Sequence, residues 1–249
     1  MKRKLIFKLL MILAVVLIAL FAEQYMFGNE IVINRYSSTE VLEYDGKLIV
    51  ELNNNIPEIS IEDAYKNGEI TPFQNYADLD IFGRSGEAYV CISAADMPNY
   101  ERGSIQRVHP SGWHLYNTKE LWNVVFEDDS FYLYNRCHII GFQLTGNDEE
   151  HGSSYLPNNL FTGTRQLNVE GMLPIENEIA TYLRFNKDGY VLYKATPVYK
   201  GNNLLASGIH LQALSLDGKV QLNVYVHNVQ EGFKIDYQTG DAIYENTNY

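Results

Sequence analysis

The stretch from Tyr134 to Glu178 concentrates residue types that could carry out metal-assisted chemistry. It places His138 in a run typical of a strand, followed by a polar loop, an Asn-rich segment and a helix that opens with carboxylates. One imidazole, one neutral oxygen ligand and one acid could therefore meet around a single hard cation. Mg²⁺ keeps most of its waters, so one Asn carbonyl and a nearby carboxylate suffice to hold it. An imidazole without a bond to the metal can then serve as a general base.

Each of these residues also has a purely structural interpretation. An isolated His on a strand, such as His138, is more often a hydrogen-bonded structural residue than a catalyst. Asn159 could cap a helix, because Asn is a favoured N-cap residue. Glu176 and Glu178 could simply complement the dipole of the helix that they begin. The spacing of the other five histidines does not indicate a zinc site.

The elements that must position these residues are mostly strands. Helices are expected at Ile61–Lys66, Asn117–Val125 and Ile175–Phe185, the last with Pro174 in its first turn. Because strands and helices do not alternate strictly, the pattern predicts an α+β domain on a mostly antiparallel central sheet with flanking helices. The expected strands are Glu30–Tyr36, Lys47–Leu52, Glu87–Ala94, Ser130–Leu144, Tyr190–Tyr199, Leu204–Leu216 and Lys219–Val229, the last two flanking a hairpin signal at Asp217-Gly218.

Composition excludes several classes of protein. The 249 residues include 31 acidic and 19 basic side chains, for a formal net charge of −12, and 46% are hydrophobic, as in a globular protein. This balance argues against coating nucleic acid by bulk charge, but not against meeting phosphates in one metal-bearing cleft. Two cysteines exclude a disulfide scaffold, a four-cysteine zinc site and an ordinary iron–sulfur site. A disulfide between Cys91 and Cys137 stays open.

Residues 1–22 are typical of an export segment, because a basic start precedes an apolar run. The uninterrupted run, Leu9–Ala22, is shorter than the roughly 20 residues of a spanning helix, and Leu20 is unfavourable for signal cleavage. A cleaved signal and a retained membrane anchor therefore both remain open. Residues 23–46 are interpreted as a spacer and 47–249 as the folded domain. The expected location is outside the cell or on the outer face of the cytoplasmic membrane, as in Gram-positive bacteria.

Several short motifs resemble one known family. Asn135-Arg136-Cys137-His138 is similar to the Asp-Arg-Gly-His signature of the DNA/RNA non-specific endonucleases, the ββα-metal nucleases. The version with Asn and Cys is nearest the Gram-positive branch of DNA-entry nucleases and secreted phage-borne DNases. The resemblance covers roughly residues 48–240. Its supporting stretches, in family order, are 83–86, 110–113, 158–165, 168–174 and 229–237.

The resemblance assigns roles to individual residues. His138 matches the general base, Arg136 the motif arginine and Asn159 the magnesium-ligating Asn. The helix acid matches Glu176, with Glu178 as the alternative. Asn168 matches a further Asn that supports the site, as Asn135 in the motif does, and Arg165 is a candidate for contacting phosphate oxygens together with Arg136.

The resemblance implies an exported, magnesium-dependent endonuclease. DNA is the expected substrate without sequence preference, RNA is left open as a second one, and the expected products carry 5′-phosphate ends. Mn²⁺ is left open as a replacement for Mg²⁺. One rival interpretation is a catalytically inactive surface-binding module or adhesin that retains the fold. Another is a nuclease toxin with an immunity partner.

Overall fold

The computed structural model describes residues 40–114, 132–147 and 156–245. They belong to one compact unit, Thr39–Tyr249. The export segment, the strand expected at Glu30–Tyr36 and the helix expected at Asn117–Val125 lie outside the described residues. No helix within the described ranges is both long and apolar enough to cross a membrane.

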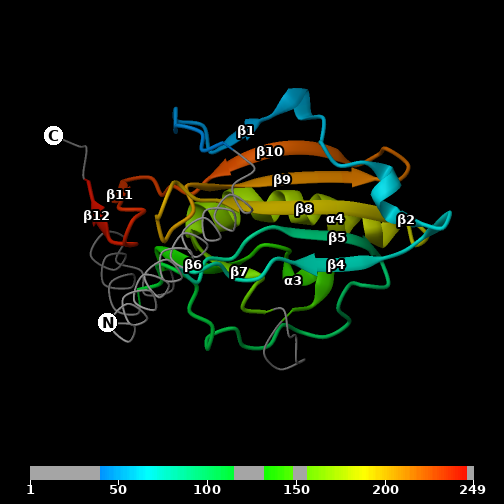
Figure 1. The fold of residues 1–249 in the computed structure, drawn as a ribbon, viewed down its shortest axis with the longest axis horizontal. Helices are drawn as coiled ribbons and strands as arrows, with labels where there is room; N and C mark the ends of the chain where they lie inside the picture. The colour runs from blue at the N-terminus through cyan, green and yellow to red at the C-terminus, as the bar shows by residue number, and fades with distance from the viewer. Residues whose placement is uncertain (1–39, 115–131, 148–155, 246–249) are drawn as a thin grey trace, which may run out of the picture. The chain divides into compact units, whose positions relative to one another are not determined.

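A six-stranded antiparallel sheet forms the centre of the domain (Figure 1). The strand order is β1-β10-β9-β8-β5-β4. The turn between β9 and β10 contains Asp217 and Gly218, and Gly218 has a φ of +74°, which suits a residue without a Cβ. The α+β class and its mostly antiparallel sheet are thereby confirmed. The strands are β1 (Ile49–Glu51), β4 (Phe73–Tyr76), β5 (Ala88–Ser93), β8 (Tyr190–Val198), β9 (Gly208–Ser215) and β10 (Gln221–His227).

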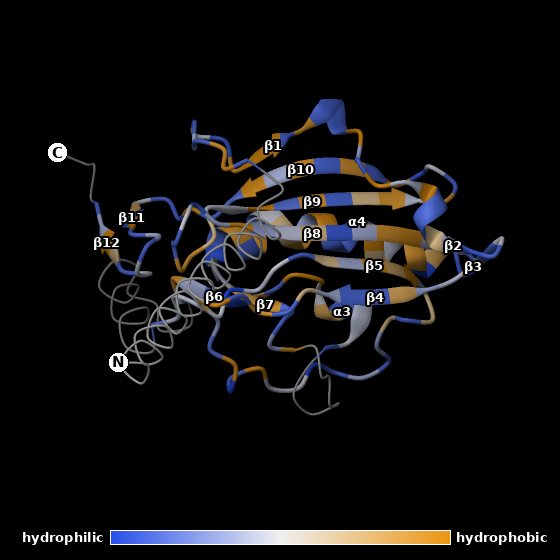
Figure 2. Ribbon diagram, viewed as in Figure 1, coloured by the Kyte–Doolittle hydropathy of each residue, from blue (hydrophilic) through white to orange (hydrophobic). Residues whose placement is uncertain are grey.

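The sheet separates two clusters of buried side chains, because successive residues of a strand face opposite sides. On β5, Val90 and Ile92 belong to the main core, while Cys91 packs on the other side with Leu192 of β8. Hydrophobic and hydrophilic residues alternate along the strands in Figure 2. The main core lies between this face of the sheet and helix α4 (Leu173–Phe185), the longest helix among the described residues.

A second layer consists of a separate two-stranded antiparallel sheet and a helix. Strand β6 (Tyr134–His138) pairs with β7 (Leu160–Thr164), and His138 lies opposite Leu160. A π-helical segment, Leu167–Met172, follows β7 and continues directly into α4 (Leu173–Phe185). Two strands followed by a helix form the ββα arrangement. Ile179, Ala180 and Leu183 of α4 pack into the main core.

Three local expectations were wrong or incomplete. The strand expected over Ser130–Leu144 ends at His138, because the chain turns at Gly141 into the short helix α3 (Phe142–Thr145). Strands β4 and β7 were not predicted. The helix expected at Ile61–Lys66 is a single 3₁₀ turn (Ile61–Ala64), capped by Ser60 and followed by strand β2 (Tyr65–Lys66).

The remaining described elements are small. A 3₁₀ turn at Asn53–Asn55 follows β1. Strand β2 pairs with β3 (Glu69–Ile70), and β11 (Phe233–Ile235) pairs with β12 (Ala242–Tyr244), both antiparallel. Cys91 and Cys137 are both buried free thiols. Burial raises the pKa of Cys91 to about 11 and that of Cys137 further, so neither thiol is ionised at neutral pH.

Candidate active site

His138 occupies the last position of β6, where the chain leaves the hairpin and turns toward α3. Its side chain is 8% exposed, while the side chain of its neighbour Cys137 points into the main core. The alternation of a strand thus directs the imidazole away from the core. His138 lines a cavity of about 810 Å³ that lies between β6, α3 and the helical segment after β7.

A backbone contact fixes the tautomer of His138. Its Nε2 lies 2.9 Å from the carbonyl oxygen of Asn147. A carbonyl oxygen can only accept a hydrogen bond, so the neutral ring must carry its proton on Nε2. The unprotonated nitrogen is then Nδ1, which is the basic atom of the ring. This arrangement prepares an imidazole to accept a proton.

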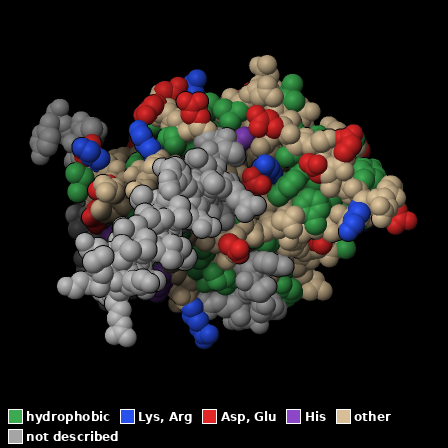
Figure 3. Space-filling model, in the orientation of Figure 1, with side chains coloured by type: hydrophobic (Ala, Val, Ile, Leu, Met, Phe, Trp, Pro, Cys, Tyr) green, Lys and Arg blue, Asp and Glu red, His purple; other side chains and the backbone are tan. Residues whose placement is uncertain are grey.

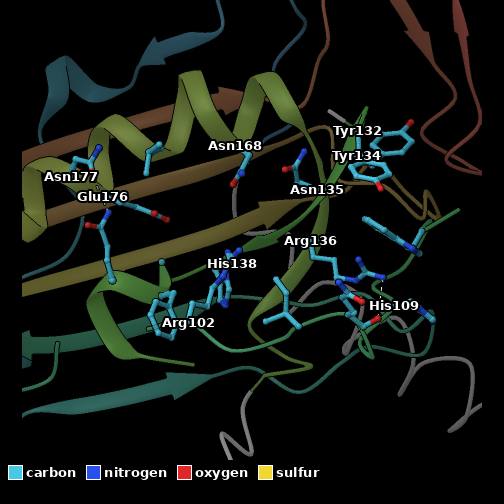
Figure 4. Close-up of a pocket in the computed structure, with 17 residues that line it drawn as sticks. Arg102, His109, Tyr132, Tyr134, Asn135, Arg136, His138, Asn168, Glu176 and Asn177 are labelled. Atoms are coloured by element: carbon cyan, nitrogen blue, oxygen red, sulfur yellow. Dashed lines mark hydrogen bonds between the residues drawn. The ribbon is translucent and has the colours of Figure 1, made fainter. Parts of the chain in front are cut away.

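The helical segment after β7 brings Asn168 and Glu176 to the same cavity. Asn168 lies in the π-helical segment, and Glu176 lies in the first turn of α4. Pro174 lies in the first turn of α4, where proline is tolerated, and the wider π turn precedes it. Figure 4 shows both side chains directed toward the cavity, with His138 facing them from β6.

The carboxyl group of Glu176 is buried, and burial disfavours its charged form. Glu176 is 9% exposed, and burial raises its pKa to about 8. It lies directly against the backbone of Gly141, where a Cβ would come within 2.4 Å of its Oε2. Asn168 lines the same cavity and offers a neutral amide oxygen, whereas the Nδ2 of Asn135, which also lines it, can only donate hydrogen bonds. A buried acid beside a neutral amide oxygen is a donor set that suits a hard divalent cation.

The described residues contain no cluster of three or more His, Cys, Asp or Glu side chains that could enclose a metal. A site built on Asn168 and Glu176 would therefore have few protein ligands. Mg²⁺ fits such a site because it retains several of its waters.

Comparisons with known proteins show the family of this chain. The family model described as DNA/RNA non-specific endonuclease matches residues 94–216. The Sda1 nuclease, solved with a bound zinc ion, is 30% identical; the match covers 80% of this chain and 97% of that one, with a TM-score of 0.58. The chain belongs to the DNA/RNA non-specific endonuclease family.

Two further relatives extend this likeness to streptococcal proteins. NucA from Streptococcus agalactiae, solved with a magnesium ion bound, is 23% identical with a TM-score of 0.65, covering 89% of this chain and 96% of that one. A deoxyribonuclease of Streptococcus dysgalactiae subsp. equisimilis is 28% identical over 198 residues, which are 68% of this chain. The match spans only 60% of that deoxyribonuclease.

Within this nuclease fold, Asn159 does not reach the cavity. It is fully buried at the start of β7, and its side chain is occupied by the backbone of Ile140. Its Oδ1 accepts from the Ile140 N–H at 2.8 Å, and its Nδ2 donates to the Ile140 carbonyl at 3.0 Å. The residue expected as the magnesium ligand thus holds the turn that follows His138. Asn168, expected only as support, lines the cavity.

Arg136 lines the cavity, but its guanidinium is bound to the loop that borders the cavity. This bordering loop follows β5, and its described part comprises residues 94–114. Its Nε donates to the carbonyl of Val108 at 2.6 Å, and a terminal nitrogen donates to the carbonyl of Gln106 at 3.1 Å. The group also stacks over the ring of Trp113, 4.0 Å from its centroid. Opposite Arg136 on β7, Thr162 donates to the carbonyl of Ser111. Both β6 and β7 therefore form hydrogen bonds to this loop.

The remaining predicted site residues fall into two groups. Asn135 lines the cavity together with His138 and Glu176, whereas Arg165 and Glu178 do not line it. Glu178 is exposed, so of the two helix acids only Glu176 faces the site.

Sequence reasoning missed the loop that borders the cavity. Arg102 and His109 line the cavity from this loop, and Arg107 lies exposed on it. These three basic residues are visible in the sequence, but no helix or strand pattern in the sequence indicates that their loop lies beside β6.

Proposed function

We propose that this protein is a divalent-metal-dependent endonuclease that cleaves DNA without sequence preference. The observation that carries the proposal is the convergence of His138, Asn168 and Glu176 on one cavity. The imidazole has a fixed tautomer, and burial raises the pKa of the acid. A satisfied structural histidine would not need either companion.

We assign the metal to Asn168, with Glu176 supporting it, and not to Asn159. The assignment follows the cavity lining and the full engagement of the Asn159 amide with Ile140. Mg²⁺ is the proposed ion and Mn²⁺ a substitute, in keeping with the magnesium reported for NucA and the zinc reported for Sda1. When bound, such a cation stabilises the negative charge that develops on the phosphate and on the leaving oxygen.

His138 acts as the general base in this proposal. Its Nδ1 takes a proton from a water molecule, whose oxygen forms a bond to phosphorus while the bond from phosphorus to the 3′ oxygen breaks in line. The products carry a 5′-phosphate and a 3′-hydroxyl. Because the carbonyl of Asn147 also accepts a hydrogen bond from the imidazolium, it stabilises the ring after the proton has arrived.

The bordering loop supplies the contacts to the nucleic acid. Arg102 and Arg107 are exposed there and can meet backbone phosphates, which carry no sequence information. Arg136 holds the loop through two carbonyl groups, so we assign it a positioning role together with its place on the cavity wall. RNA carries the same phosphodiester groups, and cleavage of RNA is part of the proposal.

Export completes the proposal. The basic and apolar residues 1–22 would direct the chain across the cytoplasmic membrane and either be removed or retained as an anchor. DNA outside the cell is then the substrate that the domain meets.

The direct test is cleavage of supercoiled plasmid by the purified protein. Degradation with Mg²⁺, its arrest by a chelator and its loss in His138→Ala are expected. Fragments from a partial digest should be joined by DNA ligase without prior phosphorylation, because their ends carry 5′-phosphates. Cleavage that continues in chelator would refute the metal dependence, and fragments that need phosphorylation first would refute the product assignment.

A further inference from the structure

We infer that Tyr76 and Asn147 are positioning residues that fix the orientation and basicity of His138, an inference that rests on the base proposed above. Asn147 is 4% exposed and lies just after α3, and its backbone carbonyl accepts the hydrogen bond from His138 Nε2. The position of that carbonyl decides both the tautomer and the angle of the ring. What holds Asn147 in place therefore also holds the base.

The side chain of Asn147 is bound to the edge of the central sheet. Its Nδ2 donates to the hydroxyl oxygen of Tyr76 at 2.9 Å and to Oγ1 of Thr145 at 3.0 Å. Tyr76 is the last residue of β4, an edge strand anchored by its pairing with β5. Its hydroxyl also lies within hydrogen-bonding distance of Gln74 and Thr145. Tyr76 thus connects Asn147, the hydrogen-bond partner of His138, to the central six-stranded sheet.

A second tyrosine holds the preceding peptide. The hydroxyl of Tyr100 donates to the carbonyl of Gly146 at 2.8 Å, and Gly146 adopts a φ of +68° as the C-cap of α3. A Cβ at Gly146 would come within 2.5 Å of that hydroxyl, so only glycine fits between them. Tyr100 therefore holds the carbonyl of Gly146, and Tyr76 holds the next residue, Asn147, through its side chain. An α3 turn of only four residues would not hold its carbonyls as firmly by itself.

The contacts of Tyr76, Tyr100 and the Asn147 side chain, here called the brace, explain how a short connection can hold a catalytic contact in place. Hydrogen bonding of Nε2 to a fixed acceptor stabilises the protonated ring more than the neutral ring, so it raises the basicity of Nδ1. A base that is displaced by about 1 Å can lose about 10²-fold in rate. Loss of the brace should therefore lower kcat and shift the protonation of His138, while substrate contacts made by the loop stay intact.

The test uses three variants: Tyr76→Phe, Asn147→Ala and the double variant that combines them. Tyr89→Phe is the control. Tyr89 lies on the neighbouring strand β5 and donates its hydroxyl to Asp63, away from the cavity, which makes it a matched control. We expect kcat to fall about 5- to 50-fold in each single variant, with KM within about twofold. The acid limb of the pH profile should move to lower pH. The double variant should be no slower than the slower single variant, because both substitutions break the same hydrogen bond between Asn147 and Tyr76. The kcat of Tyr89→Phe should match that of the wild type.

A second measurement keeps the inference separate from the proposed activity. In protein labelled with ¹⁵N-histidine, the His138 signal, identified by its absence in His138→Ala, should report the Nε2-protonated tautomer. Tyr76→Phe should shift that signal toward a tautomer mixture and lower its pKa, whether or not the protein cleaves DNA. An unchanged tautomer and pKa in folded Tyr76→Phe, with unchanged kcat, would overturn the brace. A shifted signal in a protein without nuclease activity would uphold the brace and overturn the proposed function.

Discussion

Glu176 shows how a single buried side chain can set the conditions under which a site works. Its carboxyl group is packed against Gly141 inside the protein, and its pKa is raised to about 8. Without a cation, the folded protein therefore retains a proton near neutral pH that the unfolded chain, with a carboxyl pKa near 4.5, releases. The binding of a divalent cation should displace this proton.

The stability of the metal-free protein should therefore depend on the ionisation of Glu176. A raised pKa means that the stability present below about pH 4.5 is lost progressively as pH rises toward 8. Glu176→Gln removes this loss, so at pH 9 without metal it should raise the free energy of unfolding by on the order of 1–3 kcal/mol. At pH 4.5 the two proteins should be nearly equal. Thermal unfolding at the two pH values measures this, with the exposed Glu178→Gln as the control.

The effect of Mg²⁺ on thermal stability tests the ionisation of Glu176 in a second way. Mg²⁺ should raise the Tm of the wild type increasingly between pH 6 and 8, because the carboxylate becomes available as the pH approaches the pKa of Glu176. Glu176→Gln should lose most of this response. If Glu176→Gln were less stable than the wild type at pH 9 without metal, the carboxyl group would have to make a favourable contact in its ionised form.

The secondary-structure elements show what the sequence could reveal and what it could not. All strands of the central sheet except β4 were predicted, because apolar residues such as Leu222, Val224 and Val226 alternate and Asp217-Gly218 marks the hairpin. Strand β7 was missed because Leu160–Thr164 is a short run containing a glycine, which carries no helix or strand period. Its pairing with β6 is a tertiary contact that the local sequence does not encode.

The two asparagines illustrate the same limit at the site. His138 and Glu176 were proposed because their motifs resemble those of the endonuclease family, with Glu178 as the alternative to Glu176, and both proposed residues line the cavity. Asn159 and Asn168 are equivalent by residue type, and only the turn at Ile140 and the π-helical segment decide which side chain reaches the cavity. A π turn before Pro174 has no recognisable sequence period, so the register of Asn168 was not evident.

Asn159 connects the start of β7 to the end of β6, and its substitution should affect the fold more than the chemistry. Asn159→Ala would leave both the N–H and the carbonyl of Ile140 buried without their partner. We expect a loss of about 2–5 kcal/mol in the free energy of unfolding. Below its unfolding temperature, the variant should bind Mg²⁺ with an affinity close to that of the wild type.

The adjacent Asn158 provides the control for this prediction. Its Nδ2 donates to the carbonyl of Ala77 at 3.1 Å from a partly buried position, so Asn158→Ala should cost about 1 kcal/mol or less. Chemical denaturation and metal titration of the two variants distinguish the alternatives. A stable Asn159→Ala protein that no longer binds Mg²⁺ would restore Asn159 as the ligand.

At the scale of the whole molecule, the charge distribution must reconcile a net charge of −12 with a polyanionic substrate. Acidic side chains are scattered over the face shown in Figure 3, with fewer lysines and arginines among them. The loop beside the cavity instead presents Arg102 and Arg107, with Arg136 on the cavity wall. Attraction should therefore be local to the cleft, and the number of phosphates that the protein neutralises should be small.

The salt dependence of DNA binding measures that number. For duplex DNA and the inactive His138→Ala protein, the logarithm of the binding constant should fall with log[salt] with a slope of about −2 to −3. Arg102→Gln and Arg107→Gln should each reduce the steepness by about 1. Lys219→Gln, at the distant β9–β10 hairpin and paired with Asp217, should leave the slope unchanged. A steep slope of about −6 or more would require a basic surface that the described residues do not present.

The division of work between Asn168 and His138 is best tested by titrating both alanine variants with Mg²⁺, following metal binding by calorimetry and plasmid cleavage in parallel. His138→Ala should bind Mg²⁺ within about twofold of the wild-type affinity and lose about 10²–10⁴ in rate, since it removes a base and not a ligand. Asn168→Ala should lose at least about tenfold in affinity and recover part of its activity at high Mg²⁺. Loss of metal binding in His138→Ala, or wild-type affinity in Asn168→Ala, would contradict the assignment of this site.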